Sequence, residues 1–87
     1  VMPCNLYGPN DNFDLKSSHV LPALVRKICE AESDVEIWGT GKPRREFLYS
    51  DDLAEALLFL FQLPDEVFGR LLTRPWINVG SGEDISI

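Results

Sequence analysis

The sequence has few of the side chains that build metal sites or disulfide frameworks. It contains one histidine, His19, and two cysteines, Cys4 and Cys29, which do not form a Cys-x-x-Cys motif. Because a structural zinc site usually takes four Cys or His ligands, we expect no metal. Two isolated thiols are typical of a reduced, cytoplasmic protein, which is the location that we expect.

Long apolar runs and positive charge are scarce as well. No run approaches the roughly 20 apolar residues of a membrane span, so we expect no membrane partner. Eight Lys and Arg against 14 Asp and Glu give a net charge of −6, whereas broad nucleic-acid binding needs a basic surface. We therefore exclude nucleic acid. The hydrophobic content of 45% is that of a globular chain, and 87 residues make one small domain or a piece of a larger one.

The cations of the central region lie close together in the sequence; they are Lys42, Arg44 and Arg45. Alternating residues predict a strand at 35–38, two glycines predict a turn, and a second strand is expected at 46–49. Such a hairpin would bring the three cations beside Trp38. Because an Arg side chain can grip a phosphate or carboxylate through two hydrogen bonds, this is a candidate anion site. The alternative is a solvated hairpin tip.

Apolar residues at three- and four-residue spacing predict a helix after the first loop. Pro22 fits only the first turn of a helix, so the helix should begin between Ser18 and Leu21, with Ser17 or Ser18 as its cap. This places His19 at the mouth of the helix. Histidine is the side chain whose unperturbed pKa of ~6.5 allows proton exchange near neutral pH. His19 is therefore either a catalytic acid or an ordinary polar residue at a helix end.

A second helix, expected at 51–63, is apolar on most sides. Ser50, Asp51 or Asp52 would cap it, and Pro64 would end it. Little of an 87-residue chain is available to cover this helix. We therefore expect either missing structure or a homo-oligomer that forms through residues 51–63.

Short strands and turns account for most of the remainder. Residues 1–6 are apolar enough for a buried strand, and 76–79 predict another strand before a turn at Gly80–Gly82. The polar residues at 10–12 are expected to bond to their own backbone. Both chain ends lie in apolar runs, so we interpret the chain as a fragment.

Five motifs together resemble extended short-chain dehydrogenase/reductases that act on nucleotide sugars. In order, they are Asn5-Leu6-Tyr7-Gly8-Pro9, Ser18-His19-Val20-Leu21-Pro22-Ala23-Leu24, Trp38-Gly39-Thr40-Gly41, Arg45-Glu46-Phe47-Leu48-Tyr49 and Asn78-Val79-Gly80-Ser81-Gly82. The run from Gly8 to Leu24 most resembles the GDP-L-fucose synthase family, whose members are NADPH-dependent GDP-4-keto-6-deoxymannose epimerase/reductases. The resemblance implies an α/β fold of short strands and two main helices, with the dinucleotide-binding domain mostly absent.

The resemblance also implies roles for individual residues. His19 matches the catalytic acid and lies near the cofactor. The stretch that passes the nicotinamide end of NADP is matched by Pro3, Cys4, Asn5 and Leu6. Positions that contact the GDP-sugar substrate are matched by Lys27, Trp38 and Arg45. Residues 1–9 would then be the last strand region beside the cofactor, and 10–87 the nucleotide-sugar-binding part. Lys27 stands where Arg also occurs. Lysine keeps the positive charge but cannot form the two parallel hydrogen bonds of a guanidinium group.

Other parts of the family's machinery have no counterpart in the sequence. The glycine-rich dinucleotide turn, the Ser and Tyr-x-x-x-Lys residues of reduction and the cysteine base are all absent. The 87 residues alone are therefore expected to be inactive. Two alternatives stay open: a lobe of another nucleotide-sugar epimerase or dehydratase, and a non-catalytic remnant that acts as an oligomeric binding module.

Overall fold

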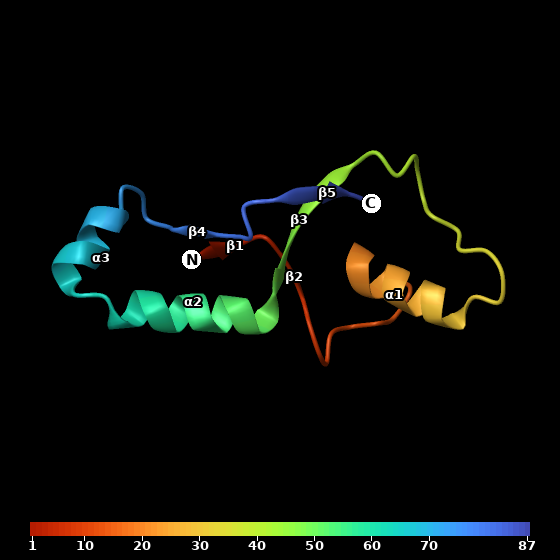
Figure 1. The fold of residues 1–87 in the computed structure, drawn as a ribbon, viewed down its shortest axis with the longest axis horizontal. Coiled ribbons are helices and arrows are strands. Elements are labelled where there is room, and N and C mark those ends of the chain that lie inside the picture. Colours follow the sequence, from red (N-terminus) through yellow and green to blue (C-terminus); the bar gives the residue numbers. More distant parts are fainter.

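The longest strand, β3 (Arg44–Tyr49), joins segments from both ends of the chain. We describe all residues, 1–87, from a computed structural model, shown in Figure 1. β3 pairs in parallel with β2 (Asn5–Tyr7) and antiparallel with β5 (Asp84–Ser86). Its second half, which includes Leu48, is the apolar part that favours a partly buried strand. The predicted strand at 46–49 is confirmed and begins two residues earlier.

A second, two-stranded sheet lies beside the first. It consists of β1 (Met2–Pro3) and β4 (Asn78–Val79), paired in parallel. The prediction of one buried strand over residues 1–6 is wrong, because the chain changes sheets at Cys4. The backbone N–H of Cys4 donates to the Val79 carbonyl (3.1 Å), whereas the next residue pairs with β3. Both short strands are exposed.

Helix α1 (Val20–Glu30) begins within the predicted interval and has Pro22 buried in its first turn. The predicted cap is wrong: His19 is the N-cap residue, and no side chain caps the helix. The Ser17 hydroxyl bonds within the preceding turn instead: it donates to the Asp14 carboxylate (3.0 Å) and accepts from the Asn12 side-chain amide (3.1 Å). The Ser18 hydroxyl oxygen is buried without a hydrogen-bond partner.

Helix α2 (Ser50–Gln62) follows β3 with no loop between them. The predicted helix at 51–63 is confirmed, but its predicted side-chain cap is wrong, since Tyr49 is the N-cap residue. Asp51 and Asp52 lie in the first turn instead. Their negative charges stabilise the helix there, because they face the positive end of its dipole. A short helix, α3 (Asp65–Leu71), begins directly after Pro64.

The predicted strand at 35–38 is wrong, and the hairpin built on it does not form. In the three-stranded sheet the order is β2-β3-β5, so β3 has a partner on each side. β2 pairs with residues 47–49 of β3 and β5 with residues 44–46, whereas residues 35–38 pair with neither half. They lie instead in the long loop between α1 and β3 (Figure 1).

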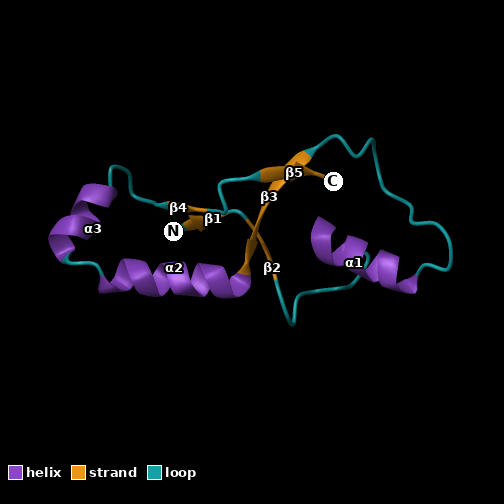
Figure 2. Ribbon diagram, viewed as in Figure 1, coloured by secondary structure: helices purple, strands orange, loops and turns teal.

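The elements are spread out rather than gathered around one core. Figure 2 shows α1 at one end of the molecule and α2 with α3 at the other, with the strands between them. Leu48 is the only buried hydrophobic side chain apart from Pro22. On α2, Leu58, Phe59 and Phe61 are 61%, 63% and 88% exposed. None of the helices combines the length and apolar character that crossing a membrane demands.

Candidate functional site

His19 lies where the first loop enters α1. Its backbone is extended (φ −71°, ψ 170°), and its carbonyl accepts the first hydrogen bond of the helix from the N–H of Ala23 (3.1 Å). The side chain is exposed. The predicted place of His19 at the mouth of the helix is confirmed.

Asp14 is the centre of the turn that precedes His19. Its Oδ1 accepts hydrogen bonds from the backbone N–H groups of Lys16 and Ser17, both at 3.0 Å, and from the Ser17 hydroxyl. The Ser17 hydroxyl bond, followed by the Lys16 backbone bond, holds the pKa of Asp14 below its usual value. We did not predict this residue. The Asp-x-x-Ser spacing, which is typical of turns closed by an Asp side chain, was the available signal.

The preceding polar residues behave as expected. The carboxylate of Asp11 accepts from the N–H of Asn12 (2.7 Å), and the Asn12 side-chain oxygen accepts from the N–H of Asp14 (3.0 Å). These side chains satisfy nearby backbone groups. The structural interpretation of Asp11 and Asn12 is therefore confirmed.

Lys27 and Trp38 come together although they lie on different segments. The Lys27 ammonium lies 4.9 Å from the centroid of the Trp38 ring and also donates to the Glu36 carbonyl (3.0 Å). Trp38 is 78% exposed, so one side of the ring remains open to a ligand. Both residues line a cavity of about 280 Å³ between α1 and the following loop. The pair offers positive charge and a flat apolar surface in one place.

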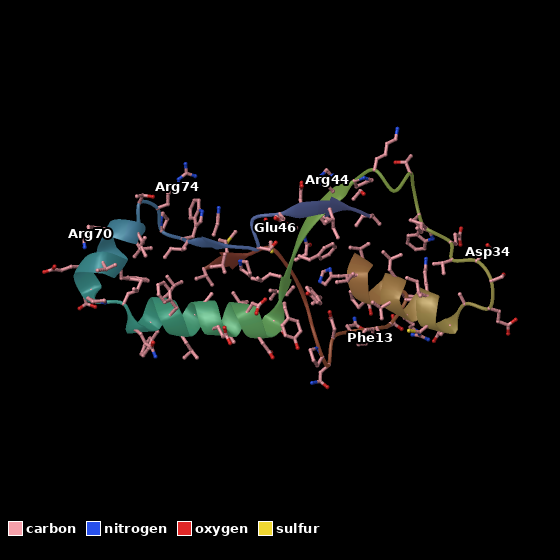
Figure 3. The ribbon with its side chains drawn as sticks, viewed as in Figure 1. Phe13, Asp34, Arg44, Glu46, Arg70 and Arg74 are labelled. Carbon is pink, nitrogen blue, oxygen red and sulfur yellow. The ribbon has the colours of Figure 1, made fainter.

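Arg45 and its neighbours do not join this cavity. The predicted cluster of three cations beside Trp38 is wrong, because β3 pairs with β5 rather than forming a hairpin. Arg44 forms an ion pair with Asp84 across that pairing (2.8 Å; Figure 3). The Asp84 hydrogen bond raises the pKa of Arg44, and the same bond lowers the pKa of Asp84. Arg45 is exposed and donates to the Arg44 carbonyl (2.8 Å).

The expected cofactor residues divide between two places. Pro3 and half-buried Cys4 line a cavity of about 410 Å³. Asn5 and Leu6 lie in β2 outside it, and the Asn5 side chain donates to the Glu46 carbonyl (2.9 Å). His19 lines neither this cavity nor that of Lys27.

Glu46 is a further residue of the Pro3–Cys4 cavity that we did not predict. Its Oε1 accepts a hydrogen bond from the backbone N–H of Gly82 (2.7 Å), where β3 meets the turn between β4 and β5 (Figure 3). A side chain at Gly80 would collide with this carboxylate. The Gly80–Gly82 turn is therefore already occupied by a carboxylate of the chain itself.

Comparisons with known proteins identify the family to which the chain belongs. A family profile described as "NAD dependent epimerase/dehydratase family" matches residues 1–80. GDP-L-fucose synthase 1 of Arabidopsis thaliana is 49% identical over 99% of the chain, and the GDP-L-fucose synthase of Sinorhizobium fredii is 51% identical over 100% of it. A solved structure, the GDP-mannoheptose C4 reductase from Campylobacter jejuni with NADP bound, is 37% identical over 94% of the chain, with a TM-score of 0.74.

The chain spans only part of each of these proteins. It covers 26% and 27% of the two synthases and 34% of the solved reductase. The resemblance that the sequence motifs predicted is confirmed, as is the mixed α/β fold.

Proposed function

The chain belongs to the NAD dependent epimerase/dehydratase family, and we propose that it forms the GDP-sugar-binding part of an epimerase/reductase that makes GDP-L-fucose. In this proposal residues 1–9 border the cofactor and residues 10–87 bind the nucleotide sugar. The substrate is GDP-4-keto-6-deoxymannose, and the reductant is NADPH. The names of the relatives support the substrate class.

The contact between Lys27 and Trp38 is the observation that carries this proposal. A nucleoside diphosphate sugar presents a flat base and a negatively charged diphosphate, and these two residues offer a flat ring and a cation within 4.9 Å of each other. Lysine binds phosphate as a point charge, and an indole supplies a broad apolar surface. Arg45 lies on β3 outside the cavity that Lys27 and Trp38 line, so in our proposal it would meet a part of the substrate that extends beyond the cavity.

The proposed role of His19 follows from the chemistry of epimerisation. Inverting a carbon beside a ketone requires a base to remove a proton and an acid to return one to the opposite face. The intermediate is an enolate, and an acid that titrates near neutral pH is well matched to it. His19 is the only side chain of that kind in the chain, and it is exposed at the mouth of α1.

The residues proposed for NADP fit its nicotinamide end and not its diphosphate. Pro3 and Cys4 line an open cavity, whereas Glu46 places a carboxylate on the neighbouring glycine turn. That negative charge would repel a phosphate. Asn5, Leu6 and His19 lie outside this cavity, and in our proposal they would border the nicotinamide from β2 and from the start of α1. When bound, NADPH supplies the hydride that reduces the ketone, and the protein positions it.

Calorimetric titration with GDP tests the binding role. We expect Lys27→Ala to weaken GDP binding roughly tenfold, equivalent to about 1.4 kcal/mol, because it removes the cation beside Trp38. Arg74→Ala is the matched control, since it also removes one positive charge but lies near α3 at the far end of the molecule (Figure 3). Equal affinity in the Lys27 variant and the unmodified chain would refute the proposed site.

We also propose that the 87 residues alone turn over no substrate. The family's Tyr-x-x-x-Lys pair and cysteine base are absent from them. Incubation with the keto-sugar and NADPH should leave the NADPH absorbance unchanged. Oxidation of NADPH that depends on the sugar would show that this prediction is wrong.

A further inference from the structure

The loop between β2 and α1 contains a closed ring of hydrogen bonds. The Asp14 carboxylate accepts from Lys16 and Ser17, and the Asp14 carbonyl accepts from the N–H groups of Ser17 (3.2 Å) and Ser18 (2.8 Å). The Asn12 side-chain amide donates to the Ser17 hydroxyl (3.1 Å). One acidic residue thus holds the three residues that lead directly to His19, namely Lys16, Ser17 and Ser18.

The same loop is tied to α1 at a second place. The Arg26 guanidinium donates from Nη1 to the Phe13 carbonyl (3.1 Å) and forms an ion pair with Glu30 through Nε (2.8 Å). Figure 3 shows Phe13 beside the helix. Because Arg26 lies on the helix and Phe13 immediately precedes Asp14, the loop cannot swing away from α1 without breaking this contact.

In the sequence, His19 lies between the turn held by Asp14 and Arg26, the helix residue that binds the Phe13 carbonyl. Its own side chain does not cap the helix. From this arrangement we propose that Asp14 is a positioning residue for His19. The Asp14 turn fixes the direction from which the chain enters the helix, and it thereby fixes where the imidazole can reach. The inference rests on the proposed acid role of His19 and names a residue that supports that role without touching the substrate.

Removing the Asp14 carboxylate should disturb the orientation of the His19 imidazole and leave the binding of the GDP-sugar intact. A catalytic group misplaced by about 1 Å can cost on the order of a hundredfold in rate. In an enzyme that contains this segment, Asp14→Ala should lower kcat at least tenfold and leave KM for the GDP-sugar nearly unchanged. Asp14→Asn keeps an acceptor oxygen and should restore most of the rate.

Nuclear magnetic resonance of the 87-residue chain tests the inference directly, because His19 is its only histidine. We expect Asp14→Ala to move the imidazole carbon and proton signals toward those of a free histidine and to speed amide exchange at Ser17. Asp11→Ala is the matched control. It also removes a loop carboxylate, but one that accepts only from the neighbouring Asn12.

Two results would overturn the inference: His19 signals that are the same in the Asp14→Ala and unmodified chains, or a Ser17 amide that exchanges freely in the unmodified chain. The α2 amides report whether a variant has lost its fold as a whole. A separate result bears on the proposed function. If His19→Ala leaves the complete enzyme fully active, the acid role fails, although the spectroscopic link between Asp14 and His19 would stand.

Discussion

At the residue scale, Asp14 and Asp84 are the carboxylates whose pKa values are lowered by the hydrogen bonds that they accept. Each accepts hydrogen bonds that favour its ionised form, and each has a pKa below its usual value as a result. Asp14 holds the turn before His19, and Asp84 holds β5 to β3 through Arg44. Both groups are exposed, so water screens part of each interaction.

These lowered pKa values predict how acid acts on the two contacts. Since a folded-state pKa is below the unfolded one, the stabilising contribution is complete above about pH 3.9, the usual pKa of Asp. It is lost as the pH falls further, through the folded-state pKa. Carbon-detected titration of the carboxyl groups should show midpoints for Asp14 and Asp84 below about 3.9.

Asn variants provide the control for this prediction. Asp14→Asn and Asp84→Asn should each remove the pH dependence of one contact and leave the other unchanged, because the two lie on separate elements. Midpoints equal to those of a free Asp would contradict the prediction.

At the element scale, the Glu46 carboxylate occupies the space beside Gly80 in the turn between β4 and β5. An added Cβ there would collide with the Glu46 carboxylate, which accepts from the N–H of Gly82. We expect Gly80→Ala to displace Glu46 and to destabilise the chain by about 1 kcal/mol, the net contribution of one hydrogen bond. Thermal unfolding and amide exchange at Gly82 measure the two effects.

Gly69→Ala is the matched control for that substitution. Gly69 lies within α3, and nothing would lie within 4 Å of its added Cβ. Because Ala favours a helix over Gly by about 1 kcal/mol, this variant should be more stable than the unmodified chain. A Gly80→Ala chain with unchanged stability and Gly82 protection would refute the prediction.

The sequence located the two main helices better than it located the strands. For α1 and α2 the apolar spacing within each segment located the helix to within a few residues. The prediction of a strand at 35–38 was wrong. Alternating polar and apolar residues show that a segment could pair with a strand, but not that it finds a strand edge to pair with. Both caps were assigned to the wrong residue. The α1 cap was expected at Ser17 or Ser18, which belong to the turn that Asp14 forms, and the α2 cap was expected at residues 50–52, which lie within the helix.

At the scale of the whole molecule, the main feature is exposed apolar surface on α2. Phe61 is 88% exposed and Phe59 is 63% exposed, in a chain with almost no buried core. Surfaces of this kind are usually interfaces. We therefore propose that the 87-residue chain forms a homo-oligomer through α2.

Light scattering after size exclusion tests this association. We expect the unmodified chain to elute with a mass above the 9.8 kDa of one copy, and Phe61→Glu to return it toward a monomer. Ile28→Glu is the matched control, because Ile28 is 62% exposed but lies on α1 at the other end of the molecule. A monomeric unmodified chain would exclude the oligomer.

The sequence by itself determined the helices, the main strand and the family, because each depends on residues that are close together in the chain. The spacing around Leu24, the motif that contains His19 and the apolar run after Ser50 are signals of this kind. For the candidate site, the sequence also indicated Lys27 and Trp38 through the family resemblance, and the structure brings these two together.

Only the tertiary structure decided which segments pair and which charges are neutralised. Arg44 bonds to Asp84, 40 residues away, rather than to a ligand beside Trp38, and Cys4 divides one expected strand between two sheets. Such partners are set by which strand edges are available after the chain has folded back on itself. Strand pairing is non-local, and local alternation carries no information about the partner.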